Sequence, residues 1–203
     1  MPPAATGAEQ SESLDDPKHA SLRRAFITAK QAEGAADARY HMQRRAGEAL
    51  QARNLAQRFG VQFEGAAVQV QHDDGWTLGL RTVGLRCGER ELAIAGAEAP
   101  VQADERHRVV RAFRTGASKL QEWWVNGPAG LEQGWTIQSN PCEPGERMTI
   151  EVGVEGLAAS GERTIALTDG DLRVAQYGDA FAVDAAGAEH AVTLAAASEA
   201  RIA

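Results

Sequence analysis

The sequence predicts a mainly β protein, a large antiparallel β-sandwich preceded by one N-terminal α-helix. Apolar and polar residues alternate in short runs from Val61 onward, which is typical of strands with one buried face. Turn-forming residues separate these runs about every ten residues, a spacing typical of sandwiches and barrels. No helical pattern of useful length follows residue 61, so the crossover connections of a parallel sheet are missing.

The first 34 residues divide into a tail and a helix. Residues 1–15 are rich in Pro, Ala, Ser and Glu without any period, and we expect a disordered tail. A helix is predicted over residues 16–34, because Asp16 can cap it, Pro17 suits its first position and Gly34 can stop it. Its apolar stripe is thin, so we expect the helix to pack on the outside of the sheet or to serve as a spacer. The residues at helical spacing are Leu22, Phe26, Ala29 and Glu33.

Residues 35–60 admit two readings. Ala, Arg, Gln and Leu favour helix there, so one long helix reaching Phe59 is an alternative. We favour strands beginning near Arg39, with Tyr40, Met42 and Leu50 placed around a turn at residues 46–48. On that interpretation residues 35–203 form one β-sandwich domain.

Period-two alternation marks the strands after residue 60. The longest such run carries Met148, Ile150, Val152 and Val154 between polar residues or glycine. Further runs centre on the following apolar residues: Val61 and Phe63; Val68 and Val70; Trp76, Leu78 and Leu80; Leu131, Trp135 and Ile137; Ile165 and Leu167; Leu172 and Val174; Phe181 and Val183; Val192 and Leu194. The turns between them hold Asp-Gly, Asn-Gly or Pro-Gly pairs, which suit tight reversals.

Charge and hydropathy exclude several classes of partner. The 203 residues carry a net charge of −7 and no basic stripe, which argues against nucleic acid. No apolar run approaches the roughly 18 residues of a membrane helix, so membrane insertion is not expected. The N-terminus shows no signal peptide, which leaves a cytosolic protein or an exported one whose signal has been removed.

Two cysteines, Cys87 and Cys142, lie in turn-like contexts. They could form a disulfide in an oxidising compartment or remain two free thiols, and both alternatives stay open. Their spacing lacks a Cys-x-x-Cys pair, so no zinc site is expected. No other metal site and no cofactor is predicted.

One aromatic segment is the strongest candidate for binding. Trp123 and Trp124 are consecutive, so on a strand they must point to opposite faces, one into the core and one outward. If residues 126–130 form a turn, Trp124 and Glu132 would lie close together, and an exposed indole beside a carboxylate can hold a sugar. The full candidate set is Trp123, Trp124, Asn126, Glu132, Gln133 and Trp135. The alternative is that these aromatic residues simply pack.

An enzyme is the weakest of the functional interpretations. Glu122 and Glu132 flank the same turn, and a glycosidase needs two carboxyl groups facing one cleft. No second polar cluster supports such a site, and no Gly-x-Ser-x-Gly or phosphate-binding loop is present. We therefore expect no catalytic residues.

The stretch LQEWWVNGPAGLEQGWTI, residues 120–137, resembles a segment in the β-rich N-terminal module of exported bacterial proteins. In those proteins the module often precedes FG-GAP (integrin-like) repeats. The similarity spans about residues 40–203 and includes LRVAQYGDAFAVD at 172–184. It implies a large antiparallel sandwich, export to the periplasm, cell surface or extracellular space, and an adhesive setting.

These observations lead to three functional hypotheses. The first is a non-enzymatic module of an exported bacterial protein, acting in cell-surface or extracellular assembly and adhesion through protein contacts at the Trp123–Trp135 hairpin or an open sheet edge. The second is a carbohydrate-binding module that uses Trp124, Glu132 and Gln133. The third is a carbohydrate-active enzyme of the supersandwich type. The partner is accordingly a protein or a glycan, and the sequence leaves the oligomeric state open.

Overall fold

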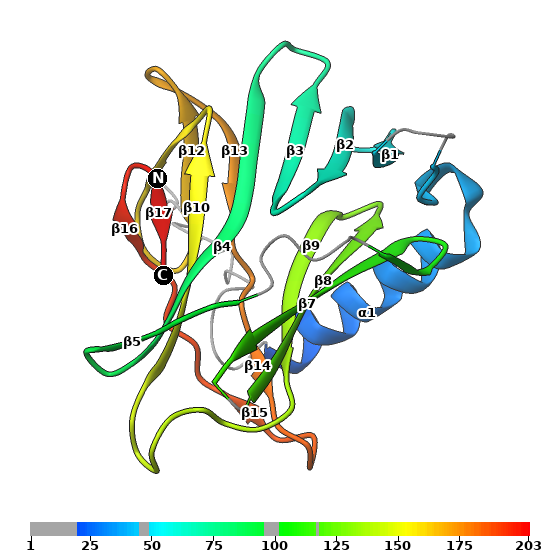
Figure 1. Cartoon of the computed structure of the whole chain (residues 1–203). Helices are drawn as coiled ribbons and strands as arrows, with labels where there is room; N and C mark the ends of the chain where they lie inside the picture. Colours follow the sequence, from blue (N-terminus) through cyan, green and yellow to red (C-terminus); the bar gives the residue numbers. More distant parts are fainter. Residues whose placement is uncertain (1–19, 45–48, 96–101, 117) are drawn as a thin grey trace, which may run out of the picture.

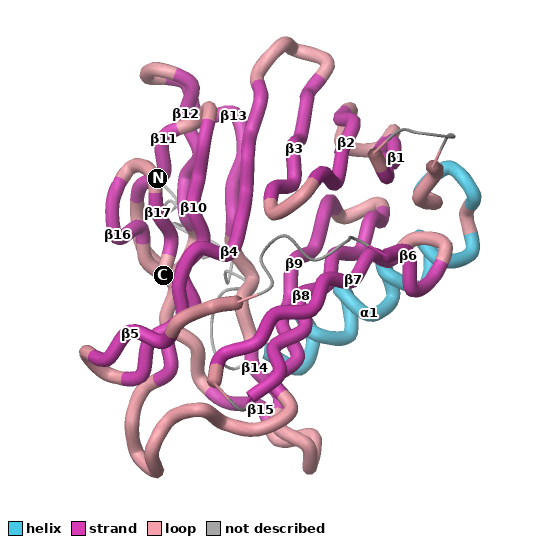
Figure 2. The backbone as a smooth tube through the Cα atoms, viewed as in Figure 1, coloured by secondary structure: helices cyan, strands magenta, loops and turns pink. Residues whose placement is uncertain are grey.

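The computed structural model describes residues 20–44, 49–95, 102–116 and 118–203, and these form antiparallel sheets with one α-helix (Figures 1 and 2). The prediction of a mainly β sandwich with an N-terminal helix is confirmed. The elements in chain order are α1 (Ala20–Ala36), the 3-10 helix η2 (Ala38–Tyr40), β1 (Leu50–Asn54), β2 (Phe59–Glu64), β3 (Ala67–His72), β4 (Thr77–Cys87), β5 (Arg90–Leu92), β6 (Gln102–Glu105), β7 (Arg108–Thr115), β8 (Ser118–Gly127), β9 (Gly130–Ile137), β10 (Met148–Glu155), β11 (Ala158–Ser160), β12 (Ile165–Asp169), β13 (Leu172–Tyr177), β14 (Ala182–Val183), β15 (Glu189–His190), β16 (Ala196–Ser198) and β17 (Arg201–Ile202).

The largest sheet has eight strands in the order β1-β2-β3-β4-β10-β17-β16, with β5 paired to β4. A four-stranded sheet runs β6-β7-β8-β9, a three-stranded sheet runs β11-β12-β13, and β14 and β15 form a two-stranded hairpin. Consecutive strands mostly pair as hairpins, as expected when short turns join antiparallel neighbours. The main exception is β4, which meets β10 across a long stretch of sequence.

The core lies between the inner face of the eight-stranded sheet and the two smaller sheets opposite it. Val61, Val68 and Leu80 of the large sheet are at most 5 % exposed. They belong to one apolar cluster with Trp124 of β8 and Ile165 of β12. Along β2 and β3 every second residue is removed from water, and this burial of apolar surface is the main driving force for assembling such layers.

Helix α1 packs against the face of the β7–β9 sheet that points away from the core (Figure 1). A Cβ atom at Gly34 would lie 2.7 Å from the carbonyl oxygen of Asn126, and one at Gly127 would lie 3.1 Å from the carbonyl oxygen of Lys30. Glycine at both positions lets the helix and strand backbones approach closely. The prediction that Gly34 stops the helix is therefore wrong, because this glycine serves packing and the helix continues to Ala36. The predicted tail at 1–15 and helix start at Asp16 and Pro17 lie outside the described residues.

The segment after α1 differs from both readings of the sequence. Residues 38–40 form a 3-10 turn rather than the start of a strand, and the first strand begins at Leu50. The turn forms because the Asp37 side chain caps it, accepting a hydrogen bond from the Arg39 backbone nitrogen at 3.0 Å. Strand β1 also excludes a continuous helix to Phe59. The predicted turn at 46–48 lies outside the described residues.

Cys87 and Cys142 are joined in a disulfide with a Cα–Cα distance of 5.3 Å. Cys87 is the last residue of β4, and Cys142 lies in the connection between β9 and β10. The bond therefore ties the chain segment that leaves the four-stranded sheet to the end of the longest strand of the eight-stranded sheet. Of the two alternatives that the sequence left open, the structure contains the bonded form.

No helix in the described part of the chain is both long and apolar enough to cross a membrane.

Candidate functional site

The β8–β9 hairpin carries all six residues of the predicted binding site. Its register pairs Glu122 with Trp135, Trp124 with Gln133, and Val125 with Glu132. Trp123 and Trp124 point to opposite faces, as predicted, because successive strand residues alternate. Trp124 is the inward one, 1 % exposed, with its ring centroid 6.3 Å from that of Phe63 in an edge-to-face contact.

The predicted sugar site at this hairpin is wrong. Trp124 shares the inner face with its cross-strand partner Gln133, whereas Glu132 points to the face covered by α1. An indole that is almost fully buried in the core offers no surface on which a sugar ring can stack. Glu122 and Glu132 are likewise on opposite faces, so the paired carboxyl groups that a glycosidase needs do not face one cleft.

Trp123 is the half-buried member of the tryptophan pair. The guanidinium carbon of Arg108 lies 5.4 Å from its ring centroid, a cation–π arrangement. The indole covers Gly134 on the neighbouring strand, where a Cβ atom would lie 2.1 Å from Trp123 Cζ2. Glycine at this position therefore makes room for the ring. The indole packs flat on the sheet instead of standing out as an anchor.

Asn126 is fully buried and joins separate parts of the fold. Its amide nitrogen donates to the carbonyl oxygens of Tyr40 at 3.0 Å and Arg53 at 3.1 Å, and its side-chain oxygen accepts from Asn54 Nδ2 at 2.9 Å. Asn54 Nδ2 also donates to the Gly127 carbonyl at 2.8 Å. These bonds connect β1 and η2 to β8, so the predicted ligand-binding role of Asn126 is wrong and its role is structural.

Glu122 is the centre of a polar network buried between the sheets. It is 0 % exposed, and its Oε1 accepts hydrogen bonds from Thr82 Oγ1 and Gln133 Nε2, both at 2.8 Å. Arg111, 2 % exposed, lies across from it with Nη1 3.3 Å from Glu122 Oε2. Arg111 Nη1 also donates to the carbonyl oxygen of Ala66 at 2.5 Å. We call these residues, with Trp135 and Tyr177, the Glu122 network.

The remaining two members are Trp135 of β9 and Tyr177 of β13, and Tyr177 extends the Glu122 network to the three-stranded sheet. The Trp135 indole nitrogen donates to Thr82 Oγ1 at 3.0 Å, and the Tyr177 hydroxyl donates to Gln133 Oε1 at 3.1 Å. Burial raises the pKa of the Tyr177 hydroxyl, and the negative charge of Glu122 raises it further. Tyr177 therefore stays protonated and acts as a hydrogen-bond donor.

The electrostatics of the network are those of a buried ion pair. Burial lowers the pKa of the Arg111 guanidinium, and the charge of Glu122 opposes this effect. Glu122 Oε2 and Arg111 Nε make no hydrogen bond within the described structure. Of the residues that the sequence placed in a ligand site, Gln133 thus donates to the buried Glu122 carboxylate, and Trp135 donates to Thr82, which in turn donates to Glu122. The arrangement can fix how the sheets dock, but it presents no acid or base to a substrate.

Glu132 lies beneath α1, where its carboxylate accepts a hydrogen bond from the Gln31 side chain. Burial raises the pKa of this carboxyl, although the Gln31 bond and the charge of Arg108 act in the opposite direction. Its position between helix and sheet explains the burial, because α1 covers this face of the hairpin. The predicted role of Glu132 in sugar binding is therefore replaced by a contact that holds the helix.

We expect Glu132→Gln to make folding stability less dependent on pH. A carboxyl whose pKa is raised in the folded state favours folding when protonated, so its contribution is lost as the pH rises from the ordinary value of 4.5 through the raised one. The glutamine variant can still accept from Gln31 without ionising. Urea unfolding should be measured from pH 4 to pH 7. As the pH rises, the free energy of unfolding of the variant should increase relative to that of the wild type. If the difference in unfolding free energy between the variant and the wild type stayed constant across that range, the burial of this carboxylate would be contradicted.

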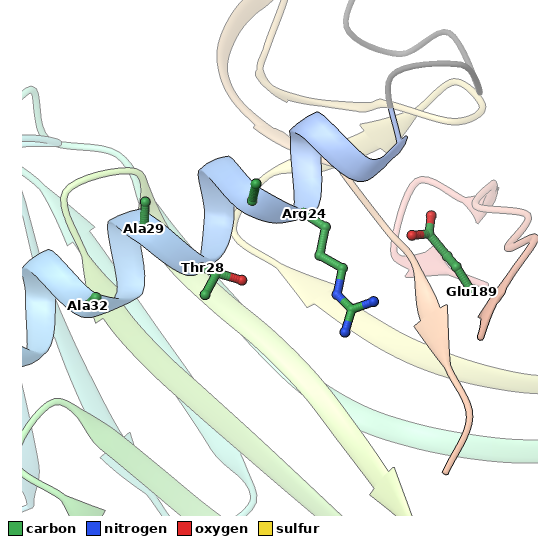
Figure 3. A pocket seen from close by; sticks show the side chains of 6 residues that line it. Arg24, Thr28, Ala29, Ala32 and Glu189 are labelled. Atoms are coloured by element: carbon green, nitrogen blue, oxygen red, sulfur yellow. The ribbon is translucent and has the colours of Figure 1, made fainter. Parts of the chain in front are cut away.

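Hollows on the surface of the described part are further candidates for a binding site. One, of about 610 Å³, lies between α1 and the β14–β15 hairpin, and Figure 3 shows Arg24 and Glu189 approaching it from its two sides. Its remaining lining consists of small helix residues, Ala25, Thr28, Ala29 and Ala32. The exposed Leu22 and Phe26 belong to the same helix. This hollow brings together no cluster of polar groups that would define a ligand.

Another hollow, of about 390 Å³, lies on the outer face of β1–β4. Cross-strand pairing places Gln51 beside Gln62 and Gln62 beside Gln69 in one row. A second row runs from Gly60 through Gln71 to Thr77. We call this surface, defined by Gln51, Gly60, Gln62, Gln69, Gln71 and Thr77, the glutamine face.

No family model matches this chain, and neither a curated protein nor a solved structure does.

Sequence reasoning missed the Glu122 network and the glutamine face. The network joins Thr82, Arg111 and Tyr177, which are scattered along the chain and show no motif. The glutamine face did leave a signal, because Gln69 and Gln71 alternate with Val68 and Val70 at the solvent-facing positions of one strand. Gln62 likewise alternates with Val61 and Phe63 along β2.

Among the described residues, the side chains close enough to share a metal ion are Cys87, Cys142 and Glu146. The two sulfur atoms are bonded to each other, so they do not offer thiolate ligands in this form.

Proposed function

We propose that this chain is a non-enzymatic recognition module of an exported bacterial protein, which acts in cell-surface or extracellular assembly by accepting a strand from a protein partner. The observation that carries the proposal is the open edge at β13. Strand β13 ends the three-stranded sheet, and its described backbone pairs only with β12. An unpaired row of backbone N–H and C=O groups is a template for strand addition.

The composition of β13 suits this role. The strand spans Leu172–Tyr177, long enough to pair with an added strand over several residues. Leu172 is 68 % exposed at its start, a large apolar side chain that a docked strand would cover. Arg173 and Gln176 are the other exposed residues of the strand, and the Arg173 guanidinium donates to Gln176 at 2.6 Å. The strand contains neither lysine nor proline, although it carries the charged Arg173 and its register against β12 shifts between Leu167 and Thr168.

Two further observations support export and a binding role. The Cys87–Cys142 disulfide suits an oxidising compartment, because such bonds are rare in the cytosol. The resemblance of residues 120–137 to the β-rich module of exported FG-GAP repeat proteins points to the same setting. Glu122 and Glu132 lie on opposite faces of the hairpin, so they do not form the carboxyl pair that a glycosidase would need. The aromatic hairpin loses its place as the docking surface, since Trp124 is internal.

Replacing both Leu172 and Gln176 with lysine is expected to abolish capture of a protein partner without unfolding the chain. Two charges on exposed edge positions repel an incoming strand and disturb no buried contact. The disulfide-bonded chain would be immobilised and exposed to the secreted and envelope proteins of the bacterium that encodes it. Captured proteins would be identified by mass spectrometry and their affinity then measured with each purified partner.

The matched control is Gln121→Lys, which adds a charge at an exposed position of β8. The proposal predicts capture by the wild type and this control, with at least a tenfold weaker affinity for the edge variant, about 1.4 kcal/mol or more. Equal capture by the edge variant, or no specific partner for the wild type, would contradict docking at β13. Near-ultraviolet circular dichroism would establish that each variant keeps the fold.

A further inference from the structure

We propose that the glutamine face is a binding site for a neutral, hydroxyl-rich ligand of the oligosaccharide class. The site is separate from the β13 edge and does not depend on the assembly function proposed above. It lies on the outer side of the eight-stranded sheet, whose inner side forms the core. The side chains that build it are consequently not required for packing.

The shape of the glutamine face suits a small chain-like ligand. The hollow of about 390 Å³ falls within the range in which proteins hold small molecules, roughly 300–1,000 Å³. Its two rows of side chains cross β1, β2, β3 and β4, so the hollow is extended across the strands. A glycine lies in the second row, at Gly60, where a side chain would otherwise occupy the middle of the hollow.

The chemistry of the lining selects the ligand class. None of the nine lining residues is ionisable, although 24 % of the chain is charged. Gln62, Gln69 and Gln71 are exposed, and no side-chain hydrogen bond occupies their amides in the described structure. Each amide offers both donors and an acceptor, and the hydroxyl of Thr77 does the same. Sugar hydroxyls also donate and accept, so a neutral saccharide can satisfy every group without burying a charge.

The cationic side chains nearest to the hollow are paired with carboxylates. Arg53 reaches towards Gly60, but its guanidinium is paired with Asp73 at 2.6 Å. At the other end, Glu155 lies beside Gly79 and faces Arg81 at 3.9 Å. An anionic ligand would therefore find no unpaired cation here among the described residues, whereas Glu64, two residues from Gln62 on the same face of β2, is an exposed carboxylate without an ion pair. This arrangement argues for a neutral glycan over an anionic one and over an acidic peptide.

Gly60 provides a sharp test because its backbone does not require glycine. Its φ is not positive, and a Cβ atom there would meet nothing nearer than Arg53 Nη1 at 3.9 Å. A valine at this position can adopt strand geometry and would fill the hollow without a clash. Gly60→Val should therefore remove ligand binding while the fold remains intact.

The experiment uses the full disulfide-bonded chain on an array of neutral oligosaccharides of four to six units, built from glucose, mannose, galactose, xylose or N-acetylglucosamine. Polygalacturonate and heparin fragments provide the charged arm, and hits are measured by titration calorimetry. We expect at least one neutral series to bind. We expect Gly60→Val, and separately the pair Gln62→Ala and Gln71→Ala, to weaken that binding at least tenfold. Gln121→Ala, an exposed glutamine on the other sheet, should leave it unchanged.

Several outcomes would overturn the proposal. These are binding of charged glycans alone, binding of no glycan, or binding that Gly60→Val and the double glutamine variant leave intact. Self-association that Gly60→Val abolishes would assign the surface to a protein contact and overturn it as well. If Gly60→Val fails to fold, the double glutamine variant decides alone, because its side chains are exposed. The Leu172 and Gln176 lysine variant should bind the glycan normally, so this test and the β13 test fail independently.

Discussion

Replacing Glu122 with alanine is expected to lower the free energy of unfolding by about 3–5 kcal/mol, the cost of leaving the partner of a buried ion pair uncompensated. Arg111 would remain 2 % exposed with no carboxylate near it. Thr82 and Gln133 would each lose the acceptor of a 2.8 Å hydrogen bond. Urea denaturation followed by tryptophan emission measures the loss, because Trp135 belongs to the network and Trp124 lies on the same face of β8 as Glu122.

Two further variants distinguish a buried charge from simple loss of packing. Glu122→Leu combined with Arg111→Met replaces both charges by apolar groups of similar size and should recover part of the stability, since such replacements are often neutral. Glu155→Ala removes an exposed carboxylate from β10 and should cost only about 0–1 kcal/mol. A loss below 1 kcal/mol for Glu122→Ala would show that the network does not hold the sheets together.

Removing the disulfide by replacing Cys87 and Cys142 with alanine is expected to cost about 4 kcal/mol of unfolding free energy. The bond closes a loop across 55 residues, and the chain-entropy relation gives a loss of about this size for such a loop. Unfolding in urea with and without dithiothreitol measures the effect on the wild type. In the presence of the reductant, the free energy of unfolding of the wild type should fall close to that of the alanine variant.

The alanine variant provides the internal control for that measurement. Dithiothreitol should leave its stability unchanged, because it has no bond to reduce. Thiol titration of the native and the unfolded wild type should find no free thiol in either state. Two reactive thiols in protein purified from an oxidising compartment would contradict the bond and, with it, the main support for export.

The strands could be predicted from sequence because their signal is local. The alternation at Met148, Ile150, Val152 and Val154 predicted a strand, and β10 spans Met148–Glu155. The same reasoning established that Trp123 and Trp124 face opposite ways. It could not tell which of them enters the core. That choice depends on where α1 docks, and the glycine pair Gly34 and Gly127 that permits the docking is separated by more than ninety residues.

The candidate site was mispredicted for the same reason. Glu122, Gln133 and Trp135 read as polar and aromatic residues around a turn, a pattern that suits an exposed binding hairpin. Their inward orientation is explained by partners elsewhere, since Thr82 lies 40 residues before Glu122 and Tyr177 lies 44 residues after Gln133. When the partners of a buried charged residue are distant in the sequence, the sequence alone cannot distinguish that residue from a solvent-exposed one. The helix before residue 36 was found, but its end was misplaced because Gly34 was assigned to a cap instead of to a contact.

The hydrogen bonds between Asn54 and Asn126 bear on how the sheets find one another during folding. An apolar interface alone would tolerate sliding, since one valine can replace another at little cost. Sliding β1 by two residues along β8 would separate these amides and leave dry donors and acceptors, each costing about 1–3 kcal/mol. The asparagine pair thus destabilises arrangements in which the sheets are shifted from their native register, and it favours a single arrangement of the layers.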